Sequence, residues 1–180
     1  MTVFIAYCIH PSPLGDLLLV SNGAALTDLH VMRGKYVPTI EAGWQCVPDD
    51  PVLRLTASEL DAYFSRRLTQ FSVPLAPHGT PFQQAAWAAL CAIPYGQTRS
   101  YGAQAQAMGK PAAARAVGAA NGRNPLGIII PCHRVLGANG DLTGYAGGLD
   151  AKQFLLRLEG ALPTQADPLS RQDDWLNPLA

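Results

Sequence analysis

The chain has 180 residues, no net charge at pH 7, 48% hydrophobic residues and only 14% charged residues, a composition that excludes a disordered chain over most of its length. It has no apolar run of ~20 residues, so we expect no membrane span and no membrane partner. Four cysteines are too few for a disulfide framework and the first residues lack the basic start of a secretory signal, so we expect a cytoplasmic protein with free thiols.

The first half of the chain predicts a small α/β domain over residues 1–75. Apolar and β-branched residues favour strands in a short antiparallel sheet, and charge spaced between apolar residues favours an amphipathic helix. We predict strands over 3–9, 17–20 and 25–31, an irregular connection over 33–51 and a helix over 52–67. The proline- and glycine-rich stretch that follows predicts a linker at 76–80.

The second half predicts a mostly helical domain over residues 81–163, which makes the fold class α+β. Ser100 is a suitable N-cap for a short helix that ends near Met108, and Gly109-Lys110-Pro111 predicts a turn before the next helix. Two short helices around such a turn form a helix-turn-helix, which is winged-helix-like here, although a plain helical hairpin has the same pattern. We predict helices over 82–93, 100–108, 112–121 and 150–158, and a loosely held tail over 164–180.

Pro131-Cys132-His133 is the most informative stretch of the chain. A thiolate is a strong nucleophile, and a neighbouring histidine can raise its population at neutral pH. The apolar run Ile128-Ile129-Ile130 before it predicts a buried strand, with the cysteine at its exit. Taken alone, the pair also fits a buried thiol beside an unrelated imidazole.

The flanking motifs resemble those of the O6-alkylguanine-DNA alkyltransferases. Strong resemblance runs from about Pro81 to Gly160, whereas residues 1–80 match mainly through Ser12-Pro13-Leu14-Gly15. The motifs that carry the resemblance, in chain order, are Ile93-Pro94-Tyr95-Gly96-Gln97-Thr98, Ser100-Tyr101-Gly102, Arg115-Ala116-Val117-Gly118, Asn124-Pro125, Pro131-Cys132-His133-Arg134-Val135, Gly144-Tyr145-Ala146-Gly147-Gly148, Lys152, Leu155-Leu156 and Glu159-Gly160. The resemblance implies direct-reversal DNA repair, in which an alkyl group passes irreversibly from O6-alkylguanine, and possibly O4-alkylthymine, to the protein in a single turnover.

The same resemblance assigns the chemistry to named residues. Cys132 would accept the alkyl group, His133 would take the thiol proton through a water, and Glu159 would orient the imidazole. Asn124 would cap the turn that aims the cysteine, and Tyr101 would donate to guanine N3. If this proton path operates, Cys132 should have a pKa below the ~8.5 of a free thiol. Arg134 is expected to serve local structure.

The implied partner is double-stranded DNA containing O6-alkylguanine, bound by a monomer through the minor groove with the target base flipped out. Residues 76–165 carry seven Lys or Arg against three Asp or Glu, which suits phosphate contacts. Arg115 would fill the vacated stack. The expected DNA-binding residues are Arg115, Tyr101, Ala113, Ala114, Gly118 and Lys110, and the expected base pocket is Val135, Tyr145, Ala146 and Gly147.

We expect no cofactor and no metal, because the histidines and cysteines of the first half form no CxxC or HxxxH pair. A Cys-His hydrolase would explain Cys132, His133 and Glu159 but not Arg115 or Tyr101. A sensor of alkylated DNA that does no repair, and a transcription factor that also repairs, are further alternatives. Gln104 departs from the resemblance, because similar proteins bury a branched apolar residue there, which puts the packing of its helix in doubt.

Overall fold

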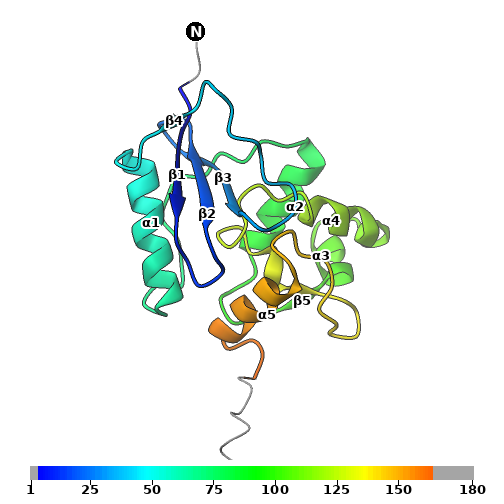
Figure 1. Ribbon diagram of the computed structural model, residues 1–180. Helices are drawn as coiled ribbons and strands as arrows, with labels where there is room; N and C mark the ends of the chain where they lie inside the picture. The colour runs from blue at the N-terminus through cyan, green and yellow to red at the C-terminus, as the bar shows by residue number, and fades with distance from the viewer. Residues whose placement is uncertain (1–3, 164–180) are drawn as a thin grey trace, which may run out of the picture.

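The computed structural model describes residues 4–163 and has the α+β architecture that the sequence predicts. Its main sheet has the order β3-β2-β1-β4 (Figure 1). The first three strands are antiparallel, and the two-residue β4 joins β1 in parallel. The strands are β1 Ala6–His10, β2 Leu17–Ser21, β3 Leu26–Val31 and β4 Gln45–Cys46. The predicted first strand over 3–9 is thus confirmed from Ala6 onward, whereas Phe4 and Ile5 lie outside β1 and Val3 lies outside the described residues.

Helix α1, Pro51–Phe64, packs against the sheet, where it contacts β1, β2 and β3. Asp50 caps its N-terminus by accepting the backbone N–H groups of Val52 and Leu53. Proline suits the first helical position, because its missing N–H would have no helical partner there. The predicted helix over 52–67 is therefore confirmed with slightly different ends.

Up to residue 163, where the described residues end, the second half contains four α-helices and a short parallel strand pair. Ser100 caps α3 as predicted, by accepting the N–H of Ala103, and α3 and α4 form the predicted helix-turn-helix around a 3₁₀ turn. The elements are α2 Pro81–Cys91, β5 Arg99–Ser100, α3 Tyr101–Ala107, η1 Pro111–Ala113, α4 Ala114–Asn121, η2 Cys132–Arg134, β6 Val135–Leu136 and α5 Leu149–Leu158. None of the helices in residues 4–163 is long and apolar enough to cross a lipid bilayer.

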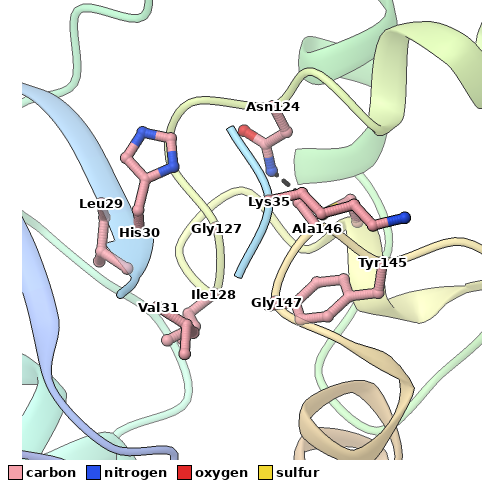
Figure 2. Close-up of a pocket in the computed structure, with 11 residues that line it drawn as sticks. Leu29, His30, Val31, Lys35, Asn124, Gly127, Ile128, Tyr145, Ala146 and Gly147 are labelled. Atoms are coloured by element: carbon pink, nitrogen blue, oxygen red, sulfur yellow. Dashed lines mark hydrogen bonds between the residues drawn. The ribbon is translucent and has the colours of Figure 1, made fainter. Parts of the chain in front are cut away.

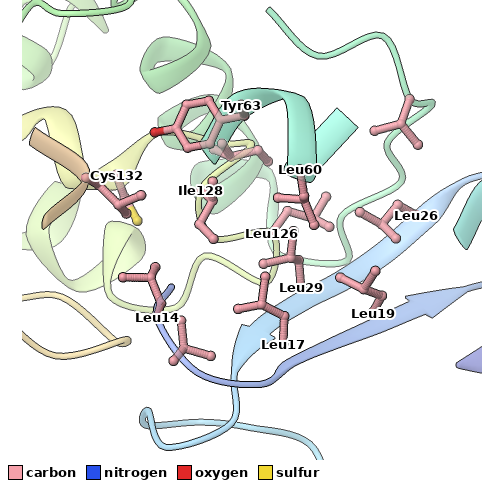
Figure 3. Close-up of a cluster of buried hydrophobic side chains, with 14 of the residues drawn as sticks. Leu14, Leu17, Leu19, Leu26, Leu29, Leu60, Tyr63, Leu126, Ile128 and Cys132 are labelled. Carbon is pink, nitrogen blue, oxygen red and sulfur yellow. The ribbon is translucent and has the colours of Figure 1, made fainter. Parts of the chain in front are cut away.

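One buried apolar cluster runs through both halves of the chain (Figure 3). Leu17 and Leu29 of the sheet and Leu60 of α1 belong to it, together with Leu126 and Leu155 from the second half. A single β-bridge between Leu29 and Leu126 adds a backbone link across the same contact. The two halves are therefore packed on each other through a shared core, which fixes the loops of the second half against the end of β3. The boundaries at 75, 80 and 163 stay a prediction, and the tail over 164–180 lies outside the described residues.

The predicted strand over Ile128-Ile129-Ile130 is wrong. Ile128 has φ of 72°, in the left-handed region, and no ladder includes this run. The side chain of Asn124 supplies part of the missing pairing, because it accepts the N–H of Leu126 and donates to the carbonyl of Ile130. Short apolar runs are ambiguous from sequence, since burial on all sides gives the same pattern in a strand and in an internally braced loop.

Gln104, the departure noted in the sequence, is fully buried in α3 and hydrogen-bonded. Its Nε2 donates to the carbonyl of Ala86 in α2 and to Oδ1 of Asn121 in α4, and Asn121 Nδ2 donates back to Gln104 Oε1 at 2.7 Å. The two amides thus satisfy each other and join three helices. The packing of α3 is maintained by this polar pair instead of by a branched apolar side chain.

Candidate active site

Cys132 and His133 lie on the short turn η2 and are both buried. Asn124, eight residues earlier, donates from Nδ2 to the sulfur of Cys132 at 3.2 Å and to the carbonyl of Ile130 at 2.8 Å. Asn124 was expected to cap the turn that aims the cysteine, and in the structure it also contacts the thiol itself. The same side chain braces the loop and contacts the sulfur, so it fixes where the thiol lies.

The imidazole of His133 is held by Glu159, which follows α5. His133 Nε2 lies 2.8 Å from Glu159 Oε1, and both side chains are inaccessible to solvent. Because the carboxylate is ionised and can only accept, Nε2 carries the hydrogen and Nδ1 keeps its lone pair. Nδ1 is buried and has no hydrogen-bond partner in residues 4–163. His133 therefore presents an unoccupied basic nitrogen, and burial lowers its pKa so that the resting imidazole is neutral.

Glu159 accepts five hydrogen bonds. Arg134 donates twice, from Nε to Oε2 and from Nη2 to Oε1, at 2.8 and 2.9 Å. Tyr63 and His133 also donate to Oε1, and the backbone N–H of Gly96 donates to Oε2. Burial opposes ionisation, but the donors from His133 and Arg134 outweigh it and hold the pKa of Glu159 at about 2. The carboxylate is a fixed negative charge at any physiological pH.

The pKa of Cys132 moves opposite to the prediction. Burial of the thiol raises its pKa above the ordinary value, and the hydrogen bond from Asn124 and the positive charge of Lys152 offset this only in part. The prediction of a depressed pKa is therefore wrong for the resting protein. Burial dominates because Cys132 is only 6% exposed, a fact that the order of residues along the chain does not reveal.

A small cavity of about 20 Å³ lies beside Cys132. Figure 2 shows Leu29, His30 and Val31 of β3 on one side of it and Tyr145 and Gly147 on the other. Lys35 joins the two sides of the cavity, because its backbone N–H donates to the carbonyl of Ala146 at 2.7 Å. At Gly147 a Cβ would lie 2.7 Å from the ring of Tyr145, so only glycine fits. Three of the four predicted pocket residues, Tyr145, Ala146 and Gly147, line this cavity.

The fourth, Val135, lies behind the cavity, where its carbonyl accepts a hydrogen bond from Lys152. The ammonium group of Lys152 is fully buried and also donates to the carbonyl of Thr143 at 2.6 Å. It thereby connects α5 to the strand after the cysteine and to the loop before Tyr145. Loss of solvent lowers the pKa of Lys152 to about 8.

The predicted DNA-binding residues gather on α3, η1 and α4. Tyr101 begins α3, donates from its hydroxyl to the carbonyl of Thr143 at 3.1 Å, and lies over Gly118, where a Cβ would be 3.6 Å from its ring. Arg115 is exposed in the first turn of α4, and Lys110 is exposed just before η1. Ala113 and Ala114, which directly precede Arg115, are half-buried. The structure therefore places Tyr101 between the loop at Thr143-Gly144 and the helix that carries Arg115.

Sequence reasoning missed several residues of the site. Arg134 serves local structure, as expected, by donating from Nη1 to the carbonyl of Ile93, but its double donation to Glu159 was not foreseen. Tyr63 reaches the same carboxylate from the first half of the chain. Lys152 falls on the buried face of α5 with Ala151, and its position on that apolar face was the available signal. No comparable signal marked Tyr63, since a tyrosine on an amphipathic helix fits any core.

The histidines and cysteines of the described first half, residues 4–80, form no candidate metal site. Within residues 4–163, no group of three or more His, Cys, Asp or Glu side chains is placed to hold a metal ion. His10 instead pairs with Asp61, and His30 with Asp28. All four cysteines are free thiols.

Comparison with known proteins matches both halves of the chain. The profile of the 6-O-methylguanine DNA methyltransferase DNA-binding domain matches residues 81–161, and that of the ribonuclease-like domain of the same family matches residues 5–77. A methylated-DNA–protein-cysteine methyltransferase of Methanosarcina acetivorans is 50% identical over 155 residues, covering 86% of this chain and 98% of that protein. The chain belongs to the methylated-DNA–protein-cysteine methyltransferase family.

Other members of this methyltransferase family agree in sequence and in structure. A relative from Mycobacterium tuberculosis is 51% identical over 148 residues, which cover 82% of this chain and 88% of that protein. The crystal structure of Mycobacterium tuberculosis OGT in complex with DNA has a TM-score of 0.80 and 47% identity, covering 87% of this chain and 93% of that one. These methyltransferase relatives match nearly the whole chain, which does not favour a Cys-His hydrolase.

Proposed function

We propose that this protein repairs O6-alkylguanine in DNA by moving the alkyl group to Cys132. The sulfur attacks the alkyl carbon attached to O6, an S–C bond forms and the C–O bond breaks. The electron pair of that bond leaves on the guanine, which takes up the proton that the thiol has lost. The products are guanine and a thioether, and because the C–S bond of a thioether is stable to hydrolysis, each molecule acts once.

His133 is the base in this proposal. Its Nε2 hydrogen is committed to Glu159, so the lone pair of Nδ1 is available to take the thiol proton, through a water if the distance requires one. The ionised carboxylate of Glu159 stabilises the imidazolium that forms. Asn124 holds the sulfur while its charge develops, through the hydrogen bond from Nδ2. His133 thus accepts the proton, Glu159 stabilises the charge on the imidazole, and Asn124 stabilises the charge on the sulfur.

Binding of the base requires the pocket to widen. A cavity of about 20 Å³ holds little more than one water, far less than a purine. Val135, Tyr145, Ala146 and Gly147 would then surround the base, with the carbonyls of Cys132 and Val135 toward its exocyclic amine and the N–H of Ala146 toward O6. The contact between Lys35 and Ala146 is the one that must yield, since it joins the two walls.

Duplex DNA would approach the face formed by α3 and α4. Arg115, Lys110, Ala113, Ala114 and Gly118 would meet the minor groove, where small side chains allow a close approach. Arg115 would fill the stack that the flipped guanine leaves, and Tyr101 would turn its phosphate and donate to N3. Action as a monomer and a cytoplasmic location, which the free thiols suit, belong to the same proposal.

The observation that carries the proposal is the joined set of Asn124, Cys132, His133 and Glu159 in a chain of this family. Incubation with a duplex containing O6-methylguanine should add about 14 Da, one CH₂, on Cys132 alone. Intact mass and peptide mapping measure this. Cys132→Ala should abolish transfer and keep DNA binding, whereas Cys91→Ala, at an exposed thiol, should change neither. Methylation of another cysteine, or several turnovers per molecule, would contradict the proposal.

A further inference from the structure

Among residues 4–80, Tyr63 makes the one hydrogen bond to the carboxylate of Glu159, through its hydroxyl. Tyr63 lies on α1, is fully buried and packs its ring against Phe71 and Tyr95 at centroid distances of 5.3 and 6.1 Å. Its hydroxyl donates to Glu159 Oε1 at 2.7 Å. Figure 3 shows this hydroxyl pointing out of the apolar cluster, toward the side on which Cys132 lies. Packing accounts for the ring of Tyr63 but leaves the hydroxyl without an assigned role.

The oxygen that Tyr63 contacts is the same one that binds His133. Glu159 Oε1 accepts from Tyr63, from His133 Nε2 and from Arg134 Nη2, at 2.7, 2.8 and 2.9 Å. A carboxylate oxygen offers about two lone-pair directions, so three donors share its charge. Each donor that joins Oε1 leaves less negative charge for the imidazole.

We infer that the Tyr63 hydroxyl is a positioning group that restrains the reactivity of the resting thiol, by sharing Glu159 Oε1 with His133. The inference rests on the proposed function, in which His133 must gain a proton before Cys132 can attack. With less charge on Oε1, the imidazolium is less stable and the proton stays on sulfur. A protein that acts once is inactivated when its thiol reacts with another electrophile, so such a restraint preserves it until a base is bound.

Apart from Glu159, the surroundings of His133 disfavour its protonated form. Burial lowers its pKa most, and the cations Arg134 and Lys152 lower it further, whereas the carboxylate of Glu159 raises it. Tyr145 meets the imidazole edge-on at 6.5 Å. Cys132, adjacent in sequence, is itself buried with a raised pKa. The basicity of His133 therefore depends on how much of the Glu159 charge it receives, which the Tyr63 hydroxyl limits.

Tyr63→Phe tests this inference because it removes the hydroxyl and keeps the ring. Iodoacetamide, a small neutral alkylating agent, should modify Cys132 in this variant about threefold faster or more at pH 7, since a hydrogen bond to a charged group changes equilibria by about this factor or more. Peptide mapping separates Cys132 from the exposed Cys46 and Cys91. The ring proton of His133, assigned with His133→Gln, should titrate at higher pH in the variant.

Tyr95→Phe is the matched control, because that hydroxyl donates to the carbonyl of Leu158 and leaves the carboxylate alone. It should leave both measurements at the wild-type values. Equal or slower modification in Tyr63→Phe, or equal acceleration in Tyr95→Phe, would overturn the inference. Incorporation of 3-fluorotyrosine at position 63 gives a second test in a folded protein, since a stronger donor should slow modification, and an unchanged rate would overturn it. Failure of wild type to accept methyl from DNA would instead overturn the proposed function.

Discussion

The cluster around Glu159 and the exposed face of α4 are built in opposite ways. In the cluster, one carboxylate receives five donors from four residues, and the side chains of Glu159 and His133 are closed to solvent. On α4, Arg115 stands exposed among small residues and makes no salt bridge within residues 4–163. In the first region the Glu159 carboxylate receives all of its donors from the protein itself, whereas the exposed Arg115 of the second region has no such partner within residues 4–163.

This difference indicates what a substitution should change in each region. A group removed from the cluster leaves a buried charge or polar atom unpaired, so folding stability falls together with function. A group removed from α4 leaves only solvent-exposed surface behind, so function should fall without stability. A cluster substitution that lowered function without lowering stability, or an α4 substitution that lowered stability, would contradict this comparison.

Glu159→Gln should have the largest effect on folding. It leaves Arg134 buried without its counter-charge, and breaking a buried pair costs about 3–5 kcal/mol of unfolding free energy. Urea unfolding at pH 7 measures the loss. Glu41→Gln, the same change at an exposed carboxylate, should cost almost nothing. A loss in Glu159→Gln no larger than in the control would mean that the cluster does not stabilise the fold.

The same substitution should change the response of stability to pH. The pKa of Glu159 falls from an ordinary 4.5 to about 2 on folding, so its contribution is complete above 4.5 and is lost as pH falls toward 2. Wild type should therefore lose stability across this window more steeply than Glu159→Gln. If unfolding free energy falls with pH equally steeply in wild type and Glu159→Gln, another carboxylate controls the response of stability to acid.

Gln104→Leu should have a smaller effect, about 1–3 kcal/mol of unfolding free energy, because it leaves the buried amide of Asn121 without its partner. Thermal or urea unfolding measures it. Gln106→Leu, on the exposed side of the same helix, should be near neutral. If Gln104→Leu stabilises the protein, apolar packing at this position outweighs the amide pair. Removing a buried polar group would then lower stability in the Glu159 cluster but not inside the helix-turn-helix.

Arg115→Ala should leave stability within about 0.5 kcal/mol of wild type, because the side chain is exposed. If Arg115 fills the stack, transfer from duplex DNA should slow about tenfold more than transfer from the free alkylated base, since only the duplex must be unstacked. Single-turnover rates on both substrates measure this, with Arg54→Ala on α1 as the control. An equal loss of transfer rate on both substrates would mean that Arg115 supports the fold or the chemical step instead of base flipping.

The sequence by itself predicted the elements that local chemistry specifies. Ser100 caps α3 and the glycine-proline turn separates it from α4, because a cap and a turn depend on residues a few positions apart. The motifs predicted that Asn124 braces the turn before Cys132 and that His133 pairs with Glu159, and the structure brings both sets of groups together. Those expectations came from resemblance, since residues 26 positions apart have no local reason to meet.

Only the tertiary structure decided how buried each of these groups is and what else reaches them. Burial raised the pKa of Cys132 where the motif predicted a lowered one, and the side chain of Asn124 turned the apolar run before Cys132 into a braced loop. Tyr63 meets Glu159 across 96 residues of chain. The free energy of a charge depends on its solvent exposure and on every donor within a few ångströms, and packing sets both of these.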